Sequence, residues 1–235
     1  HRLLEAGRLP IESGFTRLPT GEVFVAVNTP MPRTSGAMID WWFGWHSDES
    51  QRYKLWHPRA HMKANIKFST LDKPELDDRE RYVGNTSFVD EYIGTNMQRL
   101  AIQFRPPGEF GLDESRFAAG GVQTAVCANV GLANAPINFG KLAHVIRETK
   151  EGCEMRSRFW LGKLSLRNLN DAHAVNRLLA WRYLPKVAAG RDLGHDMVVH
   201  CALEMAHLAS FLPDLYADYH LSLIHISEPT RLPGI

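Results

Sequence analysis

Four apolar residues near the end of the chain recur at intervals of four, seven and three residues, which brings them to one face of an α-helix. These residues are Met197, Cys201, Leu208 and Phe211. No Pro or Gly interrupts residues 195–212. The pattern therefore predicts a long amphipathic helix over residues 194–219.

A second helical pattern covers the sequence GAMIDWWFGWH, residues 36–46. Its apolar positions lie near helical spacing, and Thr34 or Ser35 precedes it as a candidate N-cap. Residues 41–61 hold four of the six tryptophans and three of the eleven histidines. This density fits a buried core, and it also fits the wall of a site for an aromatic molecule.

Alternation and β-branched residues predict a short strand at residues 22–29, ended by Pro30 and Pro32. Residues 73–82, KPELDDRERY, are predicted to form a charged loop. Candidate strands without helices between them then follow at residues 82–94, 99–107, 123–131, 140–152 and 153–164. Turn-forming residues in RETKEGCEMR predict that the last two strands form a hairpin.

Consecutive strands that are closed by a long helix predict an α+β fold. Because no helices separate the strands, we expect a curved antiparallel sheet that grips the C-terminal helix, a helix-grip arrangement. Such an arrangement leaves a cavity between sheet and helix, and cavities of this kind bind apolar ligands.

The composition fits one main globular domain, since 44% of the 235 residues are hydrophobic. The formal charge is only +1 and no long basic run occurs, so we expect no nucleic-acid partner. No apolar run reaches the length of about eighteen residues that a membrane span needs, so we expect no membrane partner. The three cysteines form no CxxC pair, which argues against a disulfide framework and favours a cytoplasmic protein.

His200 and Glu204 lie four residues apart on the predicted helix and therefore on the same face. Such a pair is commonly an exposed ion pair. Here Cys201 and Leu208 lie beside it, which places the pair near the buried edge, where an unmatched carboxylate costs several kcal/mol. Residues 195–219 contain no Lys or Arg, so the balancing charge has to come from another element or from a metal.

Glu91 is a second anomaly, because in the strand SFVDEYIG it faces the same side as Val89 and Ile93. A carboxylate among apolar neighbours is paired, protonated or bound to a metal. Imidazole and carboxylate ligands together suit Zn²⁺, and Mn²⁺ or Fe²⁺ use the same set.

Other side chains compete for a ligand role, namely His46, His57, His61, Asp90 and His207. For His46 and His57, a packed histidine that bonds to the backbone is the more common role. His207 is the stronger competitor, because it follows Glu204 by three residues on nearly the same face of the predicted helix.

Four segments occur in order within residues 36–220: WWFGWH…RYKLWHPRAH, YVGNTSFVDEYIG, HVIRETKEGCEMRSRFWLG and HCALEMAHLASFLPDLY. Together they resemble the diacetylphloroglucinol hydrolase family, which includes phloretin hydrolase. The resemblance implies a Bet v 1-like domain with Zn²⁺ as cofactor. It also implies hydrolysis of the carbon–carbon bond between an acyl group and a phloroglucinol ring, with an acylated polyphenol as substrate. The implied metal ligands are His61, Glu91, His200 and Glu204.

The resemblance further implies that Tyr53 and His144 are catalytic, holding the ring oxygens and delivering a proton to the ring. Trp56, Asn65 and Phe159 are its substrate-binding candidates. A ring-binding tyrosine of the family falls near Phe159 here, and an asparagine falls near Ala64 or Asn65, which leaves the particular acyl phenol open. The alternative is a noncatalytic carrier or sensor of aromatic ligands with the same cavity, in which the His and Glu residues form a buried polar network.

Three segments are distinguished along the chain. Residues 1–35 are interpreted as a truncated N-terminal segment, because the chain begins at His1 rather than Met; this segment is a candidate dimerisation region, with a homodimer as the candidate assembly. Residues 36–221 are interpreted as the metal-binding catalytic domain. Residues 222–235, SLIHISEPTRLPGI, resemble a translated sequencing-adapter read-through and are interpreted as a non-native tail.

Overall fold

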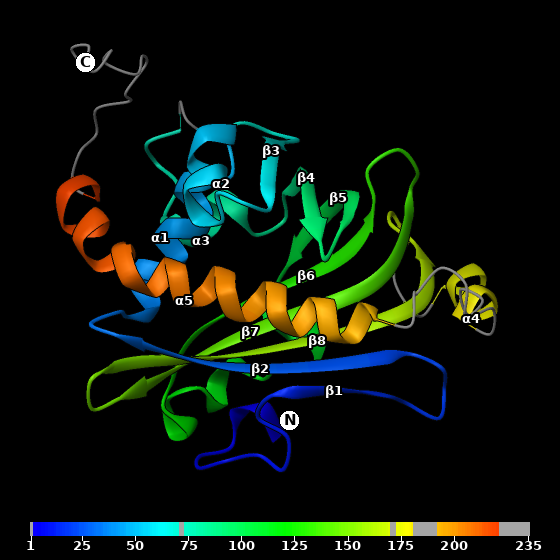
Figure 1. Cartoon of the computed structure of the whole chain (residues 1–235), viewed down its shortest axis with the longest axis horizontal. Coiled ribbons are helices and arrows are strands. Elements are labelled where there is room, and N and C mark those ends of the chain that lie inside the picture. Colours follow the sequence, from blue (N-terminus) through cyan, green and yellow to red (C-terminus); the bar gives the residue numbers. More distant parts are fainter. Residues whose placement is uncertain (1, 71–72, 170–172, 181–191, 221–235) are drawn as a thin grey trace.

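A curved sheet with a long helix across one face dominates the computed structural model, which describes residues 2–70, 73–169, 173–180 and 192–220 (Figure 1). The strands are β1 (Gly14–Arg17), β2 (Val23–Pro32), β3 (His61–Ile66), β4 (Thr86–Ile93), β5 (Asn96–Arg105), β6 (Val122–Leu132), β7 (Ile137–Thr149) and β8 (Gly152–Leu166). The α-helices are α1 (Gly36–His46), α2 (Ser50–Trp56), α3 (Asp78–Tyr82), α4 (Ala174–Ala180) and α5 (Leu193–Tyr219). Short 3-10 turns are η1 (Arg2–Leu4), η2 (Pro107–Phe110), η3 (Glu114–Arg116) and η4 (Ala118–Gly120).

The strands of the described residues form one sheet in the order β1-β2-β8-β7-β6-β5-β4-β3, and all neighbouring pairs are antiparallel. The predicted hairpin is formed by β7 and β8, with Thr149 opposite Gly152. Alternate side chains of each strand face α5 or the opposite side of the sheet. The prediction of an α+β fold, with a curved antiparallel sheet gripping the C-terminal helix, is confirmed.

One stripe of α5 is buried against the sheet, and it contains three of the four predicted apolar residues, Met197, Cys201 and Leu208, whereas Phe211 is only half-buried. Its fully buried members include Cys201, Met205, Leu208 and Leu212. Each such side chain contributes about 1.5–3 kcal/mol when it leaves water, so this stripe holds the helix on the sheet. None of the helices in the described part of the chain has the length and hydropathy to cross a membrane.

The helices α1 and α2 close one end of the sheet. Ser35 caps α1, because its side chain accepts a hydrogen bond from the Met38 amide. Helix α1 contacts α3, α5 and β6, whereas α2 contacts β3 and α5. As a result, Tyr53 and Trp56 of α2 are buried beside β3.

The N-terminal residues pack on the sheet face opposite α5. Arg156 and Arg158 of β8 are almost fully buried there and donate hydrogen bonds to backbone carbonyls of Glu5 and Ile11. Residues 14–32 form two strands of the same sheet as the rest of the chain. The predicted tail, residues 222–235, lies outside the described residues.

The prediction that Pro30 and Pro32 end the first strand is wrong, since β2 pairs with β8 as far as Pro32. A proline lacks the amide hydrogen that a central strand donates to its neighbour. Strand β1 pairs only with residues 23–26 of β2, so the later residues have no strand on that side and a proline is tolerated.

Residues 73–82 are only partly the predicted loop, because Asp78–Tyr82 form the short helix α3. The side chain of Asp77 accepts a hydrogen bond from the Glu80 amide, and the Glu80 side chain accepts one from the Asp77 amide. This reciprocal capping box starts the helix. The high charge of the segment led to the prediction of a loop instead.

Candidate metal centre and active site

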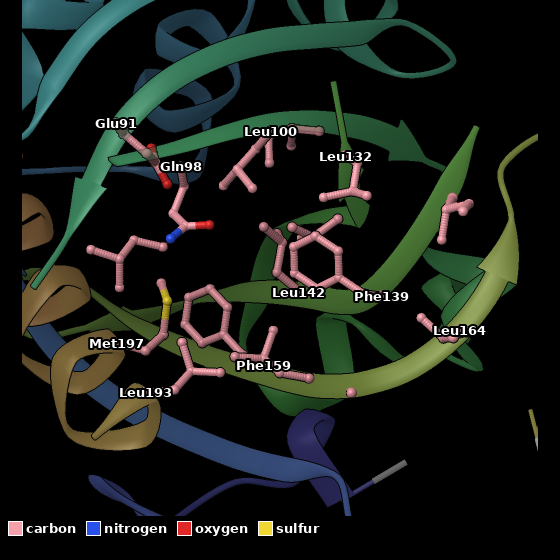
Figure 2. Close-up of a pocket in the computed structure, with 16 residues that line it drawn as sticks. Glu91, Gln98, Leu100, Leu132, Phe139, Leu142, Phe159, Leu164, Leu193 and Met197 are labelled. Atoms are coloured by element: carbon pink, nitrogen blue, oxygen red, sulfur yellow. The ribbon is translucent and has the colours of Figure 1, made fainter. Parts of the chain in front are cut away.

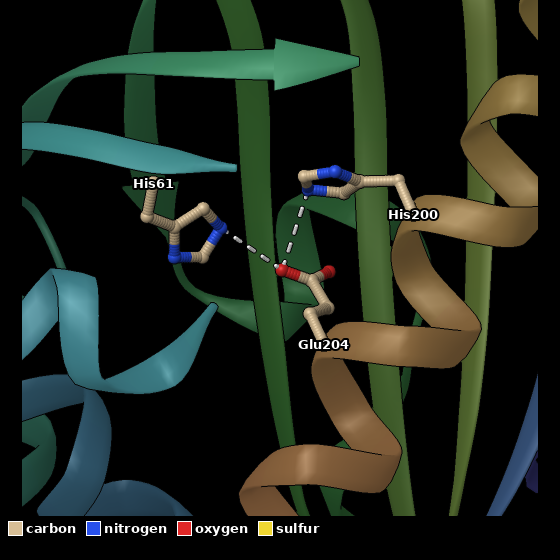
Figure 3. A group of neighbouring side chains, drawn as sticks. All are labelled: His61, His200 and Glu204. Atoms are coloured by element: carbon tan, nitrogen blue, oxygen red, sulfur yellow. Dashed lines mark ion pairs between the residues drawn. The ribbon is translucent and has the colours of Figure 1, made fainter. Parts of the chain in front are cut away.

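Three buried side chains from two distant segments meet between α5 and the sheet (Figure 3). His200 and Glu204 lie one turn apart on α5, and His61 begins β3. Glu204 Oε2 lies 3.4 Å from His61 Nε2 and 3.5 Å from His200 Nε2. One ligand atom from each residue lies within 4.8 Å of the others, which is a spacing that one metal ion can bridge.

The His61 ring is fixed with one nitrogen free. Its Nδ1 lies 3.0 Å from the Tyr53 carbonyl oxygen, so Nδ1 carries a hydrogen and Nε2 is the ring nitrogen left to bind a metal ion. The ring also stacks on Tyr53 with 3.8 Å between centroids. His61 Nε2 is buried and has no hydrogen-bond partner among the described residues. A buried acceptor without a partner is costly, and a metal ion at this position would satisfy it.

Glu91 is buried on β4 and lines the same cavity as His200 and Glu204. Its Oε2 lies 3.7 Å from His61 Nε2 and accepts a hydrogen bond from the Tyr53 hydroxyl. The inward orientation follows from the alternation that the sequence shows, since Val89 and Ile93 are buried on the same face. Glu91 therefore lies next to the three residues. Its Oε2 is close enough to His61 Nε2 for both atoms to bind one metal ion.

The charges at this site are strongly coupled. Burial lowers the pKa of His200, but the Glu204 carboxylate outweighs burial and raises that pKa to about 9. Burial likewise raises the pKa of Glu204, yet the neighbouring His200, through its charge and a hydrogen bond, holds it well below its ordinary value. Burial and the Glu91 charge raise the pKa of the Tyr53 hydroxyl well above 10, so Tyr53 stays protonated.

His144 lies on β7 and lines the same cavity, whose volume is about 80 Å³. Its Nδ1 lies 2.8 Å from Ser157 Oγ on the paired strand β8. Burial lowers the pKa of His144 to about 4, so the ring is neutral at neutral pH. We call this space, lined by Tyr53, Glu91, His144, His200, Glu204 and their apolar neighbours, the inner cavity.

Of the three substrate-binding candidates, two line the inner cavity and one does not. Trp56 and Phe159 line the inner cavity. The indole nitrogen of Trp56 is buried and lacks a hydrogen-bond partner among the described residues. The side chain of Asn65 is exposed and does not line the cavity, because the alternation of β3 buries Ala64 instead.

The competing histidines have other contacts. His46 Nδ1 lies 2.6 Å from the Trp42 carbonyl oxygen, and His207 Nδ1 lies 2.8 Å from the Trp56 carbonyl oxygen. His57 is half-buried, with its ring 5.3 Å from that of His200. None of these three histidines belongs to the group of converging ligand atoms in the described chain.

Ser157 is the contact that the sequence reasoning missed. In the hairpin register, Thr149 lies opposite Gly152, and continuing the same pairing places Ser157 opposite His144. The position of the turn between β7 and β8 therefore determines that His144 and Ser157 lie opposite each other. A fixed turn sets every later pair in a hairpin, whereas the sequence alone left the exact turn residues open.

Comparison with known proteins identifies the family. A family model described as "DAPG hydrolase PhiG domain" matches residues 1–217. The chain is 33% identical over 222 residues to the 2,4-diacetylphloroglucinol hydrolase of Pseudomonas protegens, which covers 93% of this chain and 72% of that protein. The chain belongs to the diacetylphloroglucinol hydrolase family. It is also 30% identical over 207 residues to the phloretin hydrolase of Eubacterium ramulus, covering 87% of this chain and 71% of that protein.

Solved structures similar to this member of the diacetylphloroglucinol hydrolase family have low sequence identity. Ara h 8.0201 aligns with a TM-score of 0.45 and 8% identity, covering 83% of this chain and 99% of that chain. A protein of unknown function from Staphylococcus aureus, SA2116, aligns with a TM-score of 0.44 and 9% identity, covering 84% and 96%.

Two buried histidines of this family member predict a loss of stability in acid. The pKa is lowered by burial to about 3 for His46 and to about 4 for His144, below the value of about 6.5 in an unfolded chain. Protonation below pH 6.5 therefore favours the unfolded state, by about 2 kcal/mol per histidine at pH 5. The raised pKa of His200 acts in the opposite direction by about 1 kcal/mol, so we expect these three histidines together to lower the free energy of unfolding by about 3 kcal/mol from pH 7 to pH 5.

Urea unfolding of the metal-free protein at both pH values measures this change. The His46→Gln variant keeps a donor for the Trp42 carbonyl and should reduce the difference by about 2 kcal/mol. His195→Gln, at an exposed position, is the control and should leave the difference unchanged. A difference that His46→Gln does not alter would contradict the burial argument.

Proposed function

We propose that this chain is a metal-dependent hydrolase that cleaves the carbon–carbon bond between an acyl group and a phloroglucinol-type ring. The observation that carries the proposal is the buried Nε2 of His61, which has no hydrogen-bond partner among the described residues and lies 3.4 Å from the Glu204 carboxylate, beside His200. A metal ion would satisfy this nitrogen, and the membership of the chain in a family of acylphloroglucinol hydrolases supports hydrolysis over simple ligand binding.

His61, His200 and Glu204 would hold the metal, with Glu91 as the fourth ligand. Two imidazoles and two carboxylates suit Zn²⁺, which is the metal that we propose. When bound, Zn²⁺ supplies a Lewis acid for the acyl oxygen and a nucleophile from water at neutral pH. The Tyr53 carbonyl oxygen fixes the His61 ring through Nδ1, which directs Nε2 toward Glu204.

The remaining residues would act on the ring that leaves. An oxygen–carbon bond forms between water and the acyl carbon, the acyl carbon–ring bond breaks, and its electron pair goes to the ring. The ring carbon then takes a proton, so that a carboxylic acid and a phenol are released. Hydroxyls on the ring make this departure feasible, because the negative charge is shared with their oxygens as an enolate or phenolate.

Tyr53 and His144 are placed to stabilise that charge. The Tyr53 hydroxyl keeps its proton at neutral pH and can donate it toward the ring. Neutral His144 has one hydrogen; with Ser157 Oγ donating to Nδ1, that hydrogen lies on Nε2, where it donates to a ring oxygen. Ser157 is thus a positioning residue for His144, and Trp56 offers a further donor to the ligand.

Metal content and product formation test the proposal. We expect purified protein to contain close to one equivalent of zinc, and added zinc at about 1,000 times its Kd to raise the Tm of the metal-free protein by about 10 °C. We also expect free carboxylic acid from monoacylphloroglucinol, diacetylphloroglucinol or phloretin. Less than about a tenth of an equivalent of metal together with no Tm response would contradict the proposal. Binding of these phenols without release of acid would identify a noncatalytic carrier instead.

A further inference from the structure

A second cavity, which we call the outer cavity, adjoins the inner one between α5 and the sheet (Figure 2). Its volume is about 350 Å³. Apart from Glu91 and Gln98, its walls consist of aliphatic and aromatic residues, methionine and glycine. The proposed reaction assigns it no role.

The two cavities adjoin along a shared wall. Five residues line both of them, namely Glu91, Ile102, Leu142, Phe159 and Met197. Along β7, Phe139 lines the outer cavity, Leu142 lines both, and His144 lines the inner cavity. Strand β4 repeats this order, since Ile93 lines the outer cavity, Glu91 both and Val89 the inner one. A ligand that reaches the metal candidates can therefore extend along the strands into the outer cavity.

Size requires such an extended ligand. The inner cavity of about 80 Å³ is well below the roughly 300 Å³ that pockets for whole small molecules usually have. The outer cavity of about 350 Å³ is within that range. A substrate with its reacting carbon near His200 and Glu204 consequently places part of its structure in the outer cavity.

Polarity decides which part of the substrate enters the outer cavity. A ring with several hydroxyls would leave most of them without hydrogen bonds there, at about 1–3 kcal/mol for each unsatisfied group. Tyr53, His144 and Trp56 instead offer polar groups around the inner cavity. The hydroxylated ring therefore lies at the junction with its oxygens toward the inner cavity, and the apolar part lies in the outer cavity.

The two polar residues of the outer cavity lie at its inner end. Gln98 is paired with Glu91 across β4 and β5, and Figure 2 shows both side chains on the same side of the cavity. Leu132, Phe139 and Leu164 surround the opposite end. The distal part of the ligand therefore contacts apolar side chains, and no charged residue of the described part of the chain lines that end.

We infer that the outer cavity is an acyl-chain site, and that the preferred substrates are acylphloroglucinols with an extended apolar acyl group of about six carbons or an arylalkanoyl group. This inference rests on the proposed function for the identity of the reacting bond. Each methylene moved from water into the cavity favours the longer substrate about fourfold. Hexanoyl-phloroglucinol is therefore cleaved with a kcat/KM on the order of 10² times that of acetyl-phloroglucinol.

The experiment compares kcat/KM for acetyl-, hexanoyl- and 4-carboxybutanoyl-phloroglucinol with the zinc-loaded protein. The hexanoyl compound should be preferred, and the chain that ends in a carboxylate should lose that advantage because no cation lines the far end of the cavity within the described residues. Ile137→Trp, which fills the far end, should reduce the hexanoyl-to-acetyl ratio by at least tenfold. Leu203→Trp, at a position of α5 that is 56% exposed, is the matched control and should keep the ratio.

Binding of hexanophenone and acetophenone to metal-free protein, measured by calorimetry, separates the two proposals, because these ketones lack ring hydroxyls and report on the cavity without cleavage. Tighter binding of hexanophenone that Ile137→Trp abolishes supports the acyl-chain site even if no phloroglucinol is cleaved, in which case only the proposed function fails. Equal cleavage of the acetyl and hexanoyl substrates, with equal binding of the two ketones, overturns the inference and leaves the proposed function intact.

Discussion

Replacing His200 with alanine is expected to remove the metal and to lower kcat/KM on acylphloroglucinols by about 10³-fold or more. His200 supplies one of the ligand atoms that lie within 4.8 Å of one another, and its ring contacts Glu204 Oε2 at 3.5 Å. Without it, the proposed site loses one of its four ligands and the imidazole that contacts Glu204. Elemental analysis of the purified variant and the rate of acid release measure the two effects.

His207→Ala is the matched control for this prediction. His207 lies on the same helix, but its Nδ1 is within 2.8 Å of the Trp56 carbonyl oxygen and it belongs to no group of converging ligands in the described chain. The control should keep its metal and most of its activity. A His200→Ala protein that retains a full equivalent of zinc and wild-type activity would disprove the ligand assignment.

Tyr53→Phe is expected to keep the metal and to lower kcat by about 10²–10³-fold. The phenylalanine ring can still stack on His61, and the Tyr53 backbone carbonyl that orients His61 Nδ1 is unchanged. Only the hydroxyl is lost, which donates to Glu91 in this structure and, by our proposal, to the substrate ring during cleavage. Metal content, kcat and KM of the variant are the measurements.

Tyr92→Phe is its control, because Tyr92 lies next to Glu91 on β4 but is exposed. This variant should match the wild type in both metal content and kcat. If Tyr53→Phe loses the metal together with its rate, the hydroxyl supports Glu91 as a ligand and has no separate part in the reaction.

The local sequence determined the elements whose side-chain periodicity is strong. The apolar spacing of residues 197–211 predicted α5, and the alternation around Glu91 predicted that its carboxylate faces inward. Weak local signals were insufficient for β1, α2 and β3, which no pattern predicted. Strand β3 has only six residues, and it is stabilised by pairing with β4 more than by its own propensity.

The sequence also supplied the chemistry of the site, because His200 and Glu204 share a helical face wherever the helix lies. It assigned Asn65 to the substrate on the resemblance, whereas the structure exposes that side chain and buries Ala64. A shift of one position along a strand reverses the side that a residue faces, so an assignment accurate only to a residue cannot place a side chain.

By itself, the sequence determined the fold class, the family resemblance and the residue types that can hold a metal, because these depend on periodicity and on local chemistry. Three features came from the packing of distant segments: His61 Nε2 has no hydrogen-bond partner among the described residues, Ser157 faces His144, and an apolar cavity adjoins the inner one. These features join residues far apart in the chain. Their distances are set by strand pairing and by the packing of α5 on the sheet, which local patterns do not specify.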